Sequence, residues 1–127
     1  MRYVDTNILL RVILDDNKEL ADMAESILKA DECHLLPEVI PEMIHVLHSV
    51  YKFQRSDIVE AIQQLLPLVV VKELRLTYLA LTYFAQFKLD YMDCILLAQN
   101  KLQGRDVATF DKELERKLAT IPPVSLY

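Results

Sequence analysis

Glycine is nearly absent from this sequence, since Gly104 is the only one in 127 residues. A loop that brings its backbone N–H groups against a phosphate needs several glycines, because only glycine leaves room for so close an approach. The sequence therefore argues against P-loop enzymes and against Rossmann enzymes that bind dinucleotides.

Long apolar runs are also lacking. The longest one, residues 65–71, is seven residues long and contains Pro67, whereas a helix that spans a bilayer needs about 20 apolar residues. The first residues show no basic region followed by an apolar stretch and a small-residue cleavage site. We therefore expect a cytoplasmic protein with no membrane segment.

Cysteine and histidine are too few and too scattered for a typical zinc site. Cys33 and Cys94 have no CxxC spacing, and both lie in apolar runs, so we expect buried thiols rather than a disulfide or metal ligands. His45 and His48 lie three residues apart, but no HExxH pattern occurs and His34 is remote. We expect surface or packing roles for these histidines.

Positive charge is in deficit, with 14 Lys and Arg against 19 Asp and Glu and a net charge of −5. This balance argues against a general nucleic-acid binder, because phosphates are neutralised by clustered Lys and Arg. Hydrophobic residues make up 53% of the chain, enough to bury a core and to leave an apolar patch for a partner.

Strand-like and helix-like segments alternate along almost the whole chain. Alternation of this kind predicts right-handed crossovers and one parallel sheet covered by helices on both faces. We therefore predict a single α/β domain over residues 1–127, with three layers (α/β/α) and a central, mostly parallel sheet. The expected strands are 2–5, 33–36, 69–71, 106–109 and an edge strand at 124–127; the expected helices are 6–14, 17–30, 40–51, 58–65, 75–87, 90–102 and 112–118.

Local signals mark the ends of several of these helices. Asp16, with Glu19 three residues later, resembles a capping box for helix 17–30, and Ser56 is a suitable N-cap for helix 58–65. Gly104 predicts the end of helix 90–102.

Four acidic residues occupy positions where a carboxylate needs an explanation. Asp5 and Asp111 directly follow predicted strands, and in open α/β sheets ligands bind beyond the carboxyl ends of the strands. Glu42 and Asp93 each interrupt an otherwise apolar helical stretch. Simpler roles exist for each: helix caps for Asp5 and Asp111, the helix dipole for Glu42, and an ion pair of Asp93 with Lys88 or Lys101.

Four carboxylates in one pocket repel each other, and a divalent cation removes this cost. Mg²⁺ prefers oxygen ligands and keeps several waters, which suits the hydrolysis of phosphodiesters. If two such ions bind, the formal charge rises from −5 to −5 + 4 = −1. Basic side chains are then free to follow an RNA backbone, and the candidates are Arg11, Lys52, Arg55, Lys88, Lys101, Arg105 and Lys112.

Four segments together resemble the PIN-domain family, most closely its VapC-like toxin branch. They are VDTNILLRVIL with Asp5, PEMIHVL with Glu42, DYMDCILLAQ with Asp93 and TFDKEL with Asp111. Their order and rough spacing are those of the family, and the resemblance covers nearly the whole chain. It implies a PIN-like fold and an endoribonuclease in which these four acids bind Mg²⁺ or Mn²⁺.

The resemblance also implies partners and supporting residues. It implies homodimers and a small antitoxin protein whose tail covers the site, with the first helices and the helix carrying Tyr78, Leu79, Tyr83 and Phe87 as contact surfaces. Thr6, Asn7 and Thr109 would orient Asp5 and metal-bound waters through hydrogen bonds. Asp90 lies three residues before Asp93 and is an alternative or additional ligand, although the apolar residues that follow Asp93 favour Asp93.

Other functions remain open from the sequence. A PIN-like module without catalysis would bind only RNA or protein, and a PIN nuclease can serve RNA processing outside toxin–antitoxin systems. A haloacid-dehalogenase-like phosphatase also places an Asp after its first strand, but it needs a second Asp where Asn7 stands. The presence of all four acids favours the enzyme, because a scaffold has no use for their repulsion.

Overall fold

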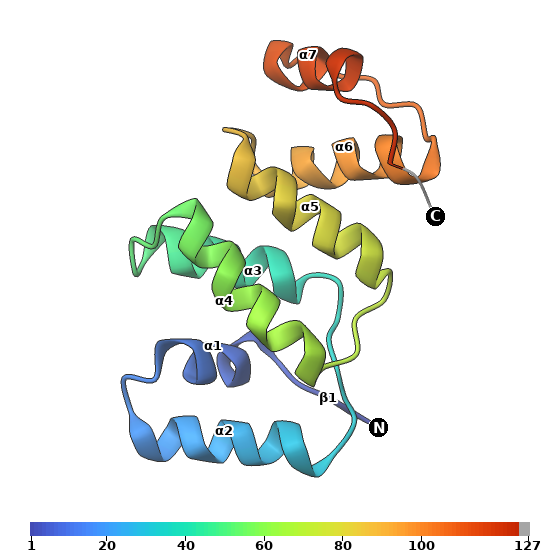
Figure 1. The fold of residues 1–127 in the computed structure, drawn as a ribbon. Coiled ribbons are helices and arrows are strands. Elements are labelled where there is room, and N and C mark those ends of the chain that lie inside the picture. The colour runs from blue at the N-terminus through green and yellow to red at the C-terminus, as the bar shows by residue number, and fades with distance from the viewer. Residues whose placement is uncertain (125–127) are drawn as a thin grey trace. The chain divides into compact units, whose positions relative to one another are not determined.

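The computed structural model describes residues 1–124 and divides by its internal contacts into two compact units (Figure 1). The first unit is Met1–Lys72, and the second begins at Glu73. Both are mainly helical, and the small sheet lies in the first unit. No helix among the described residues is long and apolar enough to cross a membrane.

The sheet of the first unit consists of two short parallel strands, β1 (Arg2–Tyr3) and β2 (Cys33–His34). Arg2 lies opposite Cys33, and Tyr3 lies opposite His34. Val70 extends the sheet by one parallel bridge to His34, with its N–H donating to the Cys33 carbonyl at 2.8 Å. The strand predicted at 69–71 is thus reduced to a single bridge.

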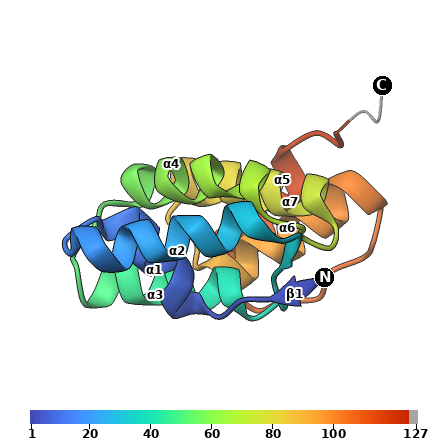
Figure 2. The same ribbon diagram turned by 90° about the horizontal axis from the view of Figure 1, so that it is seen from below.

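The first unit also contains four α-helices and one 3₁₀ helix. They are α1 (Thr6–Leu14), α2 (Lys18–Ala30), α3 (Val39–Ser49), α4 (Arg55–Leu65) and η1 (Leu66–Leu68). Helix α1 packs against α2, α3 and α4, and Figures 1 and 2 both show α1 beside α2. The fully buried side chains Leu9, Met43, Leu47, Ile58 and Ile62 come from α1, α3 and α4, so the apolar spacing read from the sequence builds this core.

Two predicted helix N-caps in the first unit are wrong. The N-cap of α2 is Asn17, whose Oδ1 accepts from the Leu20 N–H at 3.1 Å, while Asp16 lies 3.7 Å from Arg11 in an ion pair. Helix α4 begins at Arg55, so Ser56 lies inside its first turn. Neighbouring residues with similar capping ability compete, and the backbone that enters the helix decides between them.

The second unit is built from α5 (Leu74–Gln86), α6 (Tyr91–Gln103) and α7 (Lys112–Thr120). Helix α6 contacts both α5 and α7, as Figure 1 shows. Its Leu97 is fully buried, as are Leu81 of α5 and Leu114 of α7. Gly104 ends α6 with a φ of +70°, and its N–H donates to the Asn100 carbonyl, which confirms the predicted C-terminal glycine.

The predicted three-layer arrangement is not found among the described residues. Residues 106–109 are not a strand, and of the predicted edge strand 124–127 only Val124 lies within the described part, where its N–H donates to the Lys101 carbonyl at 2.8 Å. A strand forms only with a paired neighbour, and the apolar pattern of a segment does not identify that neighbour. Residues 1–124 therefore form a mixed α/β structure with a small parallel sheet.

Candidate active site

Asp5 lies between β1 and α1, where the chain changes from extended to helical. Its backbone is extended, and its Oδ1 accepts from the Ile8 N–H at 3.2 Å, so Asp5 is the N-cap of α1. Asp5 therefore has the helix-cap role that was considered for it from the sequence. A carboxylate has two oxygens and about four lone-pair sites, so a cap made through Oδ1 does not exclude binding of a cation.

Glu42 is tied to the start of α1 by a hydrogen bond across the first unit. The Thr6 hydroxyl donates to Glu42 Oε2 at 2.9 Å. Thr6 is only 5% exposed, whereas Glu42 is exposed in the first turn of α3. A buried donor of fixed position thus orients an exposed carboxylate, as is typical of residues that support metal ligands.

Asp5, Thr6, Asn7 and Glu42 line one hollow of about 390 Å³ in the first unit. Glu38 lines it as well, although the sequence reasoning did not include this residue. The signal was present, because residues four apart on a helix share a face and Glu38 lies one turn before Glu42. Two predicted acids and both of their predicted supporting residues in this unit therefore face the same space.

Asp93 is the carboxylate with the clearest electrostatic cost. It is half-buried near the start of α6, and loss of water contact raises its pKa, with further rises from the charges of Asp90 and Asp111. Asp90 is the N-cap of α6, because its Oδ1 accepts from the Asp93 N–H at 2.9 Å. Asp90 and Asp111 therefore both act on the carboxylate of Asp93.

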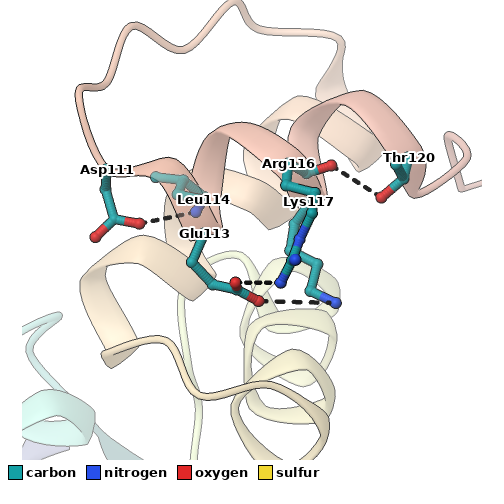
Figure 3. A network of polar contacts seen from close by, with 6 residues as sticks. All are labelled: Asp111, Glu113, Leu114, Arg116, Lys117 and Thr120. Carbon is teal, nitrogen blue, oxygen red and sulfur yellow. Dashed lines mark hydrogen bonds and ion pairs between the residues drawn. The ribbon is translucent and has the colours of Figure 1, made fainter.

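Asp111 caps α7, as Figure 3 shows, with its Oδ1 accepting from the Leu114 N–H at 2.9 Å. The loop before it is held by a second bond, in which the Asp111 N–H donates to the Thr109 hydroxyl oxygen at 3.0 Å. Thr109 therefore acts on the backbone of Asp111, whereas the sequence suggested contacts with Asp5 or metal-bound water. Glu113, which pairs with Arg116 and Lys117, turns its charge to these cations.

The donor set fits a hard divalent cation. All the candidate ligands are carboxylates, which suit Mg²⁺ and Mn²⁺ better than softer metals. Asp5 and Glu42 belong to the first unit, and Asp93 and Asp111 belong to the second. Within residues 1–124, no group of three or more His, Cys, Asp or Glu side chains is arranged to hold a metal ion.

The basic residues considered for RNA binding differ in their surroundings. Lys101 is 7% exposed, and its Nζ donates to the Leu118 carbonyl near the end of α7 at 2.7 Å, so its assignment to an RNA-facing surface is wrong. A buried ammonium satisfied by a helix carbonyl has a structural role. Lys112 and Arg11 are engaged with Glu115 and Asp16, while Lys52, Lys88 and Arg105 are exposed.

Other side chains singled out in the sequence have structural explanations. Cys33 and Cys94 are buried thiols, as predicted. His45 and His48 are exposed on α3. Tyr83 is only 5% exposed and stacks on Phe87, so it is wrong to include Tyr83 in an exposed contact surface.

Comparison with known proteins identifies one family. The family model described as PIN domain matches residues 2–118 and so includes most of both units. No curated protein and no solved structure matches the chain.

Proposed function

The chain belongs to the PIN domain family, whose fold is of nuclease type, and from this premise we propose that it is an endoribonuclease dependent on Mg²⁺ or Mn²⁺. We propose that residues 1–127 form a single PIN domain with the three-layer arrangement predicted from the sequence, and that Asp5, Glu42, Asp93 and Asp111 would hold the metal.

The observation that supports a metal site best is the environment of Asp93. Loss of hydration raises the pKa of its half-buried carboxylate, and the negative charges of Asp90 and Asp111 raise it further. Such repulsion costs stability, and a divalent cation converts it into attraction. The cost is understandable if these acids serve to bind metal.

Each residue then has a specific task. Asp5, Glu42, Asp93 and Asp111 would hold the cation, which when bound supplies an activated water and stabilises charge on the phosphate. Thr6 fixes the direction of Glu42 through its 2.9 Å hydrogen bond. Thr109 and the cap of α7 fix Asp111. Asn7 lines the hollow beside Asp5 and is suited to orient water, and Asp90 holds the first turn of α6.

We further propose that the protein is the toxin of a VapBC-like toxin–antitoxin pair. This assignment rests on the resemblance of the four acidic segments to that branch. It entails a homodimer, a small antitoxin that covers the site, and action on RNA in the cytoplasm. A neighbouring reading frame that encodes a DNA-binding amino terminus and a disordered tail would support it, and co-purification of its product with this chain would test it directly.

The decisive experiment is RNA cleavage by the purified protein with and without metal. We expect cleavage in Mg²⁺ or Mn²⁺, none in EDTA, and none by Asp5→Asn. The matched control is Asp22→Asn, which removes an exposed carboxylate from α2 and should leave cleavage intact. Cleavage in EDTA would reject metal catalysis, cleavage by Asp5→Asn would reject the site, and RNA binding without cleavage would favour a silent module.

A further inference from the structure

Lys101 is a buried, charged side chain near the end of α6. It is 7% exposed, and removing an ammonium group from water costs free energy that only good hydrogen bonds offset. A methionine of similar length would fill the same space without this cost. The bond that Lys101 makes therefore needs an explanation.

This bond satisfies a carbonyl that the sequence leaves without a helical partner. The Lys101 Nζ donates to the Leu118 carbonyl at 2.7 Å, in the last turn of α7. In a longer helix this carbonyl would accept from the N–H four residues later, but that residue is Pro122, which has no N–H. Lys101 supplies the missing donor from another helix.

A second bond holds the chain after α7 to the same residue. The Val124 N–H donates to the Lys101 carbonyl at 2.8 Å. The side chain of Lys101 thus binds the end of α7, and its backbone binds the segment that follows. Both bonds are directional, whereas the hydrophobic effect does not fix how a helix slides or rotates.

The other contacts of α7 constrain its orientation less. Leu114 is its one buried side chain. Its ion pairs, such as that of Glu113 with Arg116 in Figure 3, join residues of α7 itself and do not fix the helix to α6. Lys117 adds a contact in which its Nζ lies 4.2 Å from the centre of the Phe87 ring. The bond from Lys101 therefore determines much of how α7 is oriented on α6.

The orientation of α7 in turn decides where Asp111 lies. Asp111 caps this helix through its Oδ1, so it moves with α7. Leu118 lies four residues after Leu114 and Asp111 lies three before it, so a tilt about Leu114 shifts both ends by similar distances. The charge of Asp111 raises the pKa of Asp93 in α6, so these two carboxylates are close enough to interact.

We propose that Lys101 is a positioning residue that sets the separation of Asp93 and Asp111, and thereby determines how tightly the protein binds a divalent cation. The inference rests on the proposed function, since it takes these two acids as metal ligands. Electrostatics alone predicts the opposite effect, because removing a positive charge favours the binding of a cation nearby. A loss of affinity on removing Lys101 therefore reports a loss of position.

The first test is Mn²⁺ binding to the full chain by isothermal titration calorimetry, well below Tm. We expect Lys101→Met, which has no donor, to weaken binding about tenfold, and Lys101→Arg, which keeps a cationic donor, to bind within about threefold of the wild type. Lys29→Met removes an exposed positive charge from α2 and should bind as the wild type does. Unchanged or tighter binding by Lys101→Met would overturn the proposal.

The route through Asp111 is tested by a double-mutant cycle with Asp111→Asn. If Lys101 acts through Asp111, Lys101→Met should change the affinity by less than about twofold once Asp111 is replaced. Free Mn²⁺, counted by its electron paramagnetic resonance signal, extends the titration to weak binding. Equal losses in both backgrounds would overturn the proposal.

Folding is measured on the same variants, because a buried carbonyl without a donor also destabilises the protein. We expect Lys101→Met to lower Tm by about 3 to 8 °C. Ile62→Val, which trims a fully buried side chain of α4, destabilises the protein elsewhere and should bind Mn²⁺ as the wild type does. Weaker binding by Ile62→Val would overturn the proposal. If Lys101→Met does not fold, Lys101→Gln, a shorter neutral donor, replaces it with the same expected direction.

The second test does not require metal. Hydrogen exchange in EDTA, followed by mass spectrometry, reports the opening of each helix. We expect Lys101→Met to speed exchange in α7 at least about fivefold and to leave α5 unchanged. Equal acceleration in α5, α6 and α7 would show a core role and overturn the inference. Absence of Mn²⁺ binding by the wild type would reject the proposed metal site, and the role of Lys101 in metal binding with it, whatever the exchange shows.

Discussion

At the scale of single residues, Thr6 offers the sharpest link between structure and activity. It is buried, and its hydroxyl donates to Glu42 Oε2 at 2.9 Å. Thr6→Val removes the donor while nearly preserving the volume, so Glu42 loses its fixed direction. We expect metal affinity or kcat to fall about 10- to 100-fold, whereas Thr6→Ser, which keeps the hydroxyl, should recover most of the loss. Equal activity of Thr6→Val and wild type would contradict the role of Thr6.

Asp93 predicts a pH-dependent stability in the metal-free protein. Because its pKa in the folded state is raised above the ordinary value of 3.8, the folded protein holds its proton more tightly than the unfolded chain does. The contribution of Asp93 to the stability of the folded protein is therefore fully present below pH 3.8, and it is lost as the pH rises through the raised pKa.

The variant Asp93→Asn cannot ionise at this position, so it does not lose stability as the pH rises. In EDTA we expect it to melt at a higher temperature than the wild type near neutral pH, with the difference vanishing at acidic pH where Asp93 is protonated. Thermal melts across pH provide the measurement, and Asp22→Asn should show no comparable gain. A variant that is less stable at neutral pH would contradict the proposed repulsion.

Several details of the site could not be read from the sequence. The sequence identified candidate acids, and the structure brings Asp5 and Glu42 to one hollow. The burial of Lys101 and the exposure of Phe110 could not be predicted from the sequence. Composition and periodicity indicate the average face of a helix, whereas burial of one charged side chain depends on a partner distant in sequence, here the Leu118 carbonyl.

At the scale of elements, α7 separates the structural role of Asp111 from its proposed chemical role. Asp111 caps this helix through Oδ1, and Asn caps about as well as Asp. Asp111→Asn should therefore lose RNA cleavage but keep stability, while Asp111→Ala should lose both, at a cost of about 1 kcal/mol in unfolding free energy. Denaturant unfolding and cleavage assays on both variants test this. Retained cleavage by Asp111→Asn would leave Asp111 as a cap alone.

Helices were predictable to within one or two residues at most of their ends, and strands were not. Helix α1 matches its predicted range, and α5 and α6 differ by one residue at each end, because a helix is stabilised within its own segment and by one apolar face. Residues 106–109 have strand-like composition without being a strand. Whether such a segment forms a strand depends on pairing with another segment, and the local sequence does not identify that segment.

At the scale of the whole molecule, the two units predict a test of the single-domain proposal. If Met1–Lys72 and the unit that begins at Glu73 fold as one PIN domain, calorimetry should show one transition in which the calorimetric and van't Hoff enthalpies agree. Two separate transitions, or a Leu97→Ala variant in α6 that melts only one of them, would contradict a single cooperative domain. Leu97 suits this purpose because it is fully buried.

The most direct test of the account is Mn²⁺ binding measured by isothermal titration calorimetry on the wild type, Asp5→Asn, Asp93→Asn and the control Asp22→Asn. If the four proposed acids hold the same cation, both Asp5→Asn and Asp93→Asn should weaken binding by more than about tenfold, while the control binds as the wild type does. No binding by the wild type, or unchanged affinity in either site variant, would contradict the account.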